Sequence, residues 1–290
     1  MRRLHGATAQ RKQQSLLWAV YLSSLTSIFA EAGTLSVNGG VLRGSGVINA
    51  DVVIVSGGLA PGGSATNDNI GCPNLGSLTM NAGGTLTFDI EGSSVCSAHD
   101  QVTVSGSSVT LNSPTLALSL SGTAAQLLTG PVTLIDKQSS GSVTGTFSGL
   151  PQGTDIGLAS LEIRYDGGSG NDVVLKRVAG VPSPPSFDQG DSGLDNVTIS
   201  LTPGASAGSG PITGYRLICT DIEGAVVYDQ QQGSADFNVS DLEPGGTYSC
   251  AATAINGAGY SYASATQVYE TLVSTGLPAW LLYEASQTSP

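Results

Sequence analysis

Residues 242–248 read Leu-Glu-Pro-Gly-Gly-Thr-Tyr, and residues 256–259 read Asn-Gly-Ala-Gly. Short alternating segments surround these turns at 196–201, 214–219, 235–239 and 247–254. Apolar and polar residues that alternate between Gly-, Pro- and Asp-rich turns are typical of antiparallel strands. About seven such strands within about ninety residues predict a small β-sandwich.

This region resembles a fibronectin type III domain. Leu242 and Tyr248 match the tyrosine corner of that family, and Tyr215 matches the aromatic residue of its third strand. The Trp that this family usually has on its second strand is absent here, and Ile199 and Leu201 lie near its expected place. We expect both tyrosines to pack in the core. The resemblance also implies that Cys219 and Cys250 lie on adjacent strands of one sheet.

The residues before this sandwich repeat a phrase. GTLSVNGG at 33–40 returns as GSLTMNAGG at 76–84 and, in part, as GTLTFDI at 84–90. Short strands at near-regular spacing favour a solenoid of stacked turns, although a β-sandwich shows similar alternation. In a solenoid, one apolar row points inward, and we expect it to contain Leu35, Val37, Leu78, Met80, Leu86 and Phe88.

Residues 33–63 resemble the autotransporter-associated β-strand repeat, and the segment up to Lys176 resembles the end of such passenger regions. The matching phrases include VTLIDKQSSGSVTGTFSGLPQG and IRYDGGSGNDVVL. The resemblance covers about half of the chain and implies a short right-handed parallel β-helix, commonly a stalk at the cell surface.

One segment within that region fits a calcium-binding nonapeptide. Residues 167–175, GGSGNDVVL, follow the pattern G-G-x-G-x-D-x-U-x, whose turns hold Ca²⁺ between consecutive copies. This chain has one copy, and the same residues also suit a closing strand that needs no metal. Asp166 and Asp172 are the candidate ligands, although we favour the reading without metal.

The N-terminus predicts an export signal over residues 1–32. Arg2, Arg3, Arg11 and Lys12 precede the apolar run LLWAVYLSSLTSIF at 16–29, and Ala-Glu-Ala at 30–32 suits signal peptidase. A buried helix or a misassigned start codon is the alternative. Four cysteines divide evenly between the two regions and predict the disulfides Cys72–Cys96 and Cys219–Cys250. Zinc is disfavoured because no C-x-x-C pair is present.

Composition excludes several functions. From Gly33 onward the chain has 6 basic and 21 acidic residues, so 6 − 21 = −15, which disfavours nucleic-acid binding. We find no G-x-S-x-G elbow, Walker motif or dinucleotide fingerprint. His99 is the single histidine after residue 32, and its place in a turn beside Asp100 predicts a surface residue. Asp89, Glu91 and Asp100 are the carboxylates that a polysaccharide-active solenoid would use.

The sequence therefore predicts an all-β protein, a short right-handed parallel β-solenoid followed by a fibronectin type III-like antiparallel sandwich. The expected parts are a signal peptide (1–32), the solenoid (33–178), a Pro-rich linker (179–186), the sandwich (187–272) and a short apolar tail (273–290). We expect a bacterial protein, exported to the cell surface or medium, without catalysis or cofactor and without a membrane span after signal cleavage. We expect its partner to be a protein or glycan that it binds in adhesion or at the envelope. The alternatives are a polysaccharide-active protein and a fragment of a larger passenger.

Overall fold

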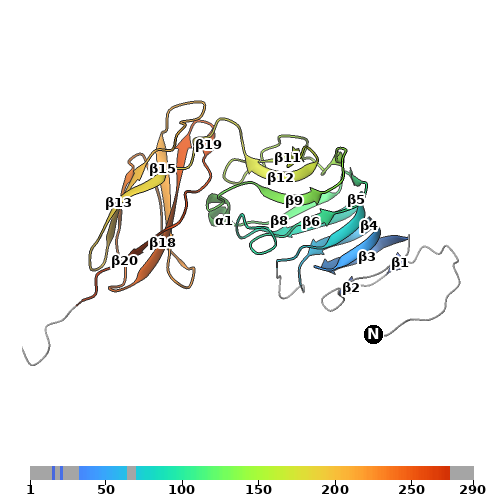
Figure 1. The fold of residues 1–290 in the computed structure, drawn as a ribbon, viewed down its shortest axis with the longest axis horizontal. Helices are drawn as coiled ribbons and strands as arrows, with labels where there is room; N and C mark the ends of the chain where they lie inside the picture. Colours follow the sequence, from blue (N-terminus) through green and yellow to red (C-terminus); the bar gives the residue numbers. More distant parts are fainter. Residues whose placement is uncertain (1–14, 17–19, 22–32, 64–69, 275–290) are drawn as a thin grey trace, which may run out of the picture. The chain divides into compact units, whose positions relative to one another are not determined.

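The computed structural model describes residues 15–16, 20–21, 33–63 and 70–274. The chain divides into two compact units, Met1–Val178 and Ala179–Pro290, and β-strands make up nearly all of their regular structure (Figure 1). The predicted export signal lies outside the described residues, except for the short strands β1 (Ser15–Leu16) and β2 (Val20–Tyr21), which pair in parallel with β3. Most of the predicted tail also lies outside them.

Unit 1 begins with three long strands that lie side by side in parallel (Figure 1). They are β3 (Thr34–Gly44), β4 (Val47–Pro61) and β5 (Asn74–Asp89). The shorter strands that follow pair in parallel with earlier ones, β6, β7 and β8 with β5, β9 with β6, and β10 with β7. Their bounds are β6 (Val102–Val104), β7 (Val109–Asn112), β8 (Thr115–Ser119), β9 (Val132–Lys137) and β10 (Thr144–Thr146).

These pairings form three separate ladders along the long strands. One ladder aligns Ile48, Leu75 and Val104, a second aligns Val37, Ile54, Met80 and Leu111, and a third aligns Leu42, Leu59, Leu86 and Leu116. Because apolar residues share a register, the apolar side chains of neighbouring strands lie in rows. The core of unit 1 therefore runs continuously along the ladders.

The predicted inward row is largely buried. Val37, Leu78, Met80, Leu86 and Phe88 are at most 4% exposed, whereas Leu35 is half-buried. Leu35 has Val52 on one side, but the described residues of β1 pair with Ser36 and Val37 and do not extend to it.

The parallel order ends with an antiparallel pair. β11 (Leu161–Gly167) pairs with β12 (Asp172–Arg177), and β12 pairs antiparallel with β9. The single helix in the described part of the chain, α1 (Gly122–Gln126), connects β8 to β9, and the Ser121 hydroxyl caps its first turn.

Unit 2 consists of two antiparallel sheets that face each other (Figure 1). One contains β13 (Ser186–Ser192), β14 (Val197–Thr202) and β17 (Asp236–Val239). The other contains β15 (Gly214–Thr220), β16 (Val226–Gln232), β18 (Thr247–Asn256), β19 (Gly259–Tyr260) and β20 (Gln267–Glu270). Apolar residues of both sheets form one buried cluster between them.

The tyrosines lie where the sequence places them. Tyr215 and Tyr248 are 6% and 5% exposed and belong to the core, as do Ile199 and Leu201. The Tyr248 hydroxyl accepts a hydrogen bond from the Glu243 amide at 2.8 Å, beside Leu242, and so fixes the corner before β18.

Much of the expected linker is bonded to unit 2. The Gly180 carbonyl accepts hydrogen bonds from the Ser209 amide and the Asn256 side-chain amide, each at 2.8 Å. The Ser183 amide donates to the Ser206 carbonyl at 2.8 Å. Residues 180–183 are therefore held against the loop before β15.

Candidate interaction site

Both predicted disulfides are confirmed. Cys219 and Cys250 are direct partners in the register of β15 and β18, both are buried, and their sulfurs are bonded. In unit 1, Cys72 is bonded to Cys96. The described residues contain no free cysteine, so these thiols have a structural role.

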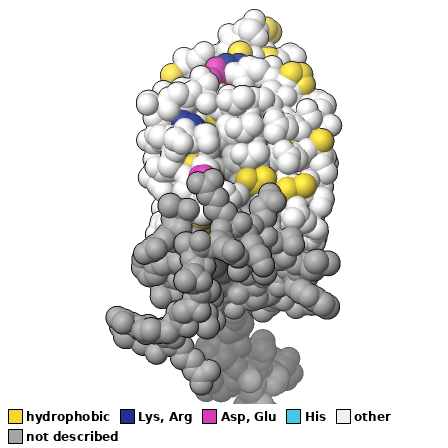
Figure 2. Space-filling model, turned by 90° about the vertical axis from the view of Figure 1, so that its right-hand side faces the viewer, with side chains coloured by type: hydrophobic (Ala, Val, Ile, Leu, Met, Phe, Trp, Pro, Cys, Tyr) yellow, Lys and Arg dark blue, Asp and Glu magenta, His cyan; other side chains and the backbone are white. Residues whose placement is uncertain are grey.

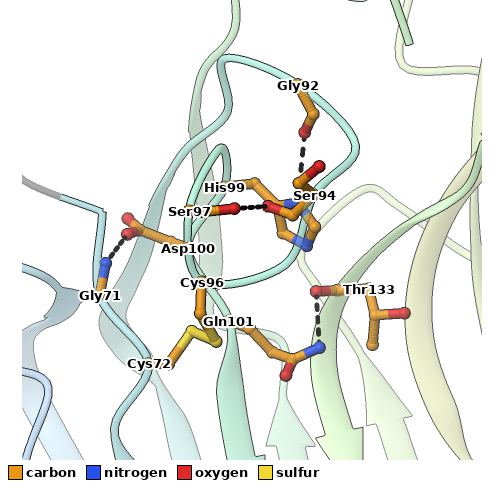
Figure 3. The surroundings of a disulfide bond; sticks show 10 residues. All are labelled: Gly71, Cys72, Gly92, Ser94, Cys96, Ser97, His99, Asp100, Gln101 and Thr133. Carbon is orange, nitrogen blue, oxygen red and sulfur yellow. Dashed lines mark hydrogen bonds between the residues drawn. A yellow bond between two sulfur atoms is a disulfide. The ribbon is translucent and has the colours of Figure 1, made fainter. Parts of the chain in front are cut away.

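The Cys72–Cys96 bond closes a loop that is also held by a buried carboxylate (Figure 3). Asp100 is 1% exposed, and its two oxygens accept hydrogen bonds from the amides of Gly71 and Asp89, at 2.7 and 2.8 Å. Gln101 reaches across to the Thr133 carbonyl. Because both Asp100 oxygens bind backbone amides, this carboxylate fastens the loop to neighbouring strands.

The prediction that His99 is a surface residue is wrong. Its side chain is 1% exposed, and Nδ1 lies 3.2 Å from the Gly92 carbonyl oxygen. Burial lowers the pKa of His99 below its usual value, and hydrogen bonds with the backbone of Gly92 and Thr133 oppose part of that shift. The physical reason is the loop, which folds back over β5 and encloses the ring.

The carboxylates of the polysaccharide alternative do not form one group. β5 ends at Asp89, which is half-buried; Glu91 lies beyond it and is exposed, whereas Asp100 is buried on backbone amides. Among the described residues, no three His, Cys, Asp or Glu side chains are grouped to hold a metal ion.

The two candidate calcium ligands make other contacts. Asp166 is exposed and bonded to both Arg164 Nε and Nη2, at 3.0 and 2.7 Å, and this arginine lowers the pKa of Asp166 to about 2. Asp172 Oδ1 accepts from the Lys137 amide at 2.9 Å, and burial raises the pKa of this carboxyl group. The structure does not bring the two carboxylates together on one partner.

A lysine ammonium group occupies the loop next to Asp172. Lys137 is 2% exposed, and its Nζ donates to the carbonyl oxygens of Ser139, Ser140 and Gly141, each at 2.8 Å. Asn171, from the predicted calcium motif, donates to the Lys137 and Ser139 carbonyls. The motif thus helps to hold an internal cation that the protein itself supplies.

The visible face of unit 1 carries little charge. In Figure 2, most of the surface that is not grey is white, the colour of the backbone and of side chains that are neither charged nor hydrophobic, and the charged groups are isolated. This agrees with a chain in which 11% of residues are charged. Such a surface offers hydrogen bonds but no strong electrostatic attraction.

In the described part of the chain, no helix is long and apolar enough to span a membrane.

Unit 2 contains a surface groove between two of its strands. It lies between β13 and β20, encloses about 360 Å³, and is lined by Phe187, Asp188, Gly190, Ser192, Gln267, Val268, Tyr269 and Glu270. The rings of Phe187 and Tyr269 meet edge to face with centroids 6.1 Å apart. Val268 is 51% exposed. We call this the β13–β20 groove.

Comparison with known families agrees with the architecture of unit 2. The fibronectin type III family model matches residues 182–270. Residues 182–270 form a fibronectin type III domain. The match begins within the expected linker, in agreement with the bonds that hold residues 180–183 to this unit.

Solved structures with similarity to the fibronectin type III region include three modules from animals. Domains A168–A170 of titin share 25% identity over 35% of this chain and 36% of that one, with a TM-score of 0.30. A domain of human fibronectin type III domain containing protein 3 shares 20% identity over 34% of this chain and 93% of its own, with a TM-score of 0.29. The FN5 domain of Drosophila Lar shares 23% identity over 32% of this chain and 98% of its own, with a TM-score of 0.26. The chain thus spans about a third of the titin fragment, and no curated protein matches it.

Sequence reasoning did not find the β13–β20 groove. Its two sides, 187–192 and 267–270, lie far apart in the sequence and carry no motif. The one available signal is the acidic residue on each side, Asp188 and Glu270, in a region that is poor in basic residues.

Proposed function

We propose that this protein is an exported, non-catalytic interaction protein of a bacterial envelope or its surroundings. In this proposal, residues 33–178 form a short parallel β-solenoid of the autotransporter-passenger kind, which serves as a stalk. The fibronectin type III domain is the module that binds a protein or glycan, in adhesion or in attachment to the envelope.

The observation that carries the proposal is the disulfide-linked fibronectin type III domain. Such sandwiches are common in cell-surface proteins, where loops and sheet edges contact partners. The two disulfides support an oxidising compartment, because thiols in the cytosol are kept reduced. The parallel ladders of unit 1, with one apolar row per turn, support the stalk.

The chemistry of the described residues supports a binding role over catalysis. His99 is enclosed, Asp100 binds backbone amides, and Asp166 binds Arg164. A general acid or base needs access to substrate at hydrogen-bonding distance. The exposed features of the domain are instead an aromatic groove and strand edges, which suit recognition.

The test is location on intact cells. Cells that produce the protein are treated with protease or labelled with antibody, and the medium is assayed in parallel. We expect surface signal, or protein in the medium, for the chain and for a Leu17→Val control. Leu17→Arg places a charge within the apolar run and should retain the protein inside. Cytosolic protein with reduced cysteines would contradict the proposal.

A further inference from the structure

The β13–β20 groove lies between two strand edges that face each other. β13 pairs with β14 alone and β20 with β18 alone among the described strands. Just beyond both strands, the Leu272 amide donates to the Gly193 carbonyl at 2.7 Å. Within the described residues, no backbone bond joins the two strands along the groove itself. Their outer amides and carbonyls are therefore available to a further strand.

We propose that this groove receives an extended, Lys- or Arg-bearing peptide segment of another protein, which pairs as a strand with the outer edge of β13, beside β20. The inference rests on the proposed function and names the class of partner. Strand addition takes affinity from main-chain hydrogen bonds, and specificity comes from pockets for alternate side chains.

The floor of the groove is built from an aromatic ring and a glycine. A Cβ added at Gly190 would lie 2.3 Å from Tyr269 Cε1, so the tyrosine ring rests directly on the backbone of β13. A bulge between Phe187 and Gln189 shifts the register of β13 beside that contact. Because the ring bridges the two sheets at this point, the groove has an apolar floor and stays open to solvent.

Charge selects a basic occupant. Asp188 and Glu270 on the two walls, and Asp191 beside them, are exposed. None of the three forms an ion pair with a basic residue of the described chain. Residues 179–290 have one basic and eleven acidic side chains, 1 − 11 = −10, and that single base, Arg216, donates from Nε and Nη2 to the two carboxylate oxygens of Asp229. The domain therefore cannot neutralise its own groove.

The same charge disfavours a second copy of the chain as the occupant. Two copies would bring like-charged groove walls together, and like charges across paired strands are destabilising. A basic segment from another protein gains attraction from both walls. We therefore expect affinity that falls as salt is added.

The experiment uses the purified full chain and a labelled hexapeptide of alternating Lys and Thr, with fluorescence anisotropy as the readout. A control peptide in which each Lys is replaced by Glu should not bind. The same Lys peptide with N-methyl groups on alternate residues keeps its charge but cannot pair as a strand, so it should bind at least tenfold more weakly. Glu270→Gln should weaken binding about two- to five-fold, as for an exposed ion pair. Glu223→Gln, the same change in the loop before β16, should leave binding unchanged.

Three results would overturn the inference. The first is no binding of the Lys peptide; the second is equal binding of the N-methylated peptide, which would mean attraction to net charge alone. The third is binding that appears only after residues 275–290 are removed, which would assign the groove to the protein's own tail. Location on the cell is measured separately, so surface exposure without peptide binding would leave the proposed function standing.

Discussion

At the residue scale, His99 makes the stability of unit 1 depend on pH. Burial lowers its pKa below 6.5, so the unfolded chain binds a proton more readily than the folded one. This contribution to stability is present above the unfolded pKa and is lost as pH falls from there to the folded pKa. His99 is the one histidine of residues 33–290, so we expect the unfolding temperature to fall between pH 7 and 5.

The variant His99→Gln should remove much of that pH dependence, whatever its effect on stability at pH 7. Gln230→Asn, at an exposed position of β16, is the matched control and should keep the pH dependence of the parent. Thermal unfolding followed by circular dichroism at several pH values provides the measurement. An unchanged slope in His99→Gln would show that another group titrates.

The internal ammonium of Lys137 gives a second prediction at this scale. Lys137→Met keeps the length of the side chain but removes the donor to the carbonyls of Ser140 and Gly141, whereas the Ser139 carbonyl keeps its bond from Asn171. Unmet polar groups of this kind cost about 1–3 kcal/mol, so the free energy of unfolding should fall by that amount. Lys176→Met is the control, because the Lys176 side chain is 43% exposed and its Nζ lies 3.9 Å from Glu162 Oε1. If urea titrations give the two variants the same free energy of unfolding, then the bonds of Lys137 to the loop carbonyls do not stabilise the protein.

Single residues were predictable where the pattern is local. The two cysteines in each half of the chain identify their disulfide partners, and Leu242 with Tyr248 marks the corner before β18. The burial of His99 was not predictable, because it depends on Asp100 reaching Gly71, 29 residues earlier in the chain. The hydrogen bonds around Lys137 have no sequence signature either, because Asn171, which helps to hold that loop, is 34 residues away in the chain.

At the element scale, glycines control how closely neighbouring segments of unit 1 approach each other. A Cβ at Gly106 would lie 1.8 Å from the Gly76 carbonyl oxygen, which is a backbone atom and cannot move aside. We expect Gly106→Ala to destabilise unit 1 by about 1–3 kcal/mol, as overpacking does. Gly122→Ala is the control, because space is open there and the first turn of α1 favours Ala by up to about 1 kcal/mol. Urea unfolding of both variants should give opposite signs.

Repetition in the sequence predicted the strands of unit 1 and part of their alignment. Leu35 and Leu78, from the two copies of the repeated phrase, both pair with Val52, and Val37 and Met80 both pair with Ile54. The phrase therefore marks one ladder. The antiparallel pair β11–β12 and the register shifts near Asn38 depend on long-range packing, and the repeat does not encode them.

At the scale of the whole molecule, composition predicted an all-β protein, and residues 242–248 and 256–259 resembled a fibronectin type III domain, in agreement with the family match at 182–270. The bonds from Gly180 to Ser209 and Asn256 hold the first part of the expected linker to unit 2. The β13–β20 groove arises only when the edges of two sheets meet, so it could not be read from either strand.

Two compact units, each with its own disulfide, predict two separable unfolding transitions. Removal of Cys219–Cys250, which spans 31 residues, should destabilise one transition by about 3 kcal/mol through the entropy of the unfolded chain. Removal of Cys72–Cys96, which spans 24 residues, should act by a similar amount on the other transition. Calorimetry of the full chain with each pair changed to Ala makes the comparison, and each variant is the control for the other. If both variants shift one shared transition equally, then the chain unfolds as a single cooperative body.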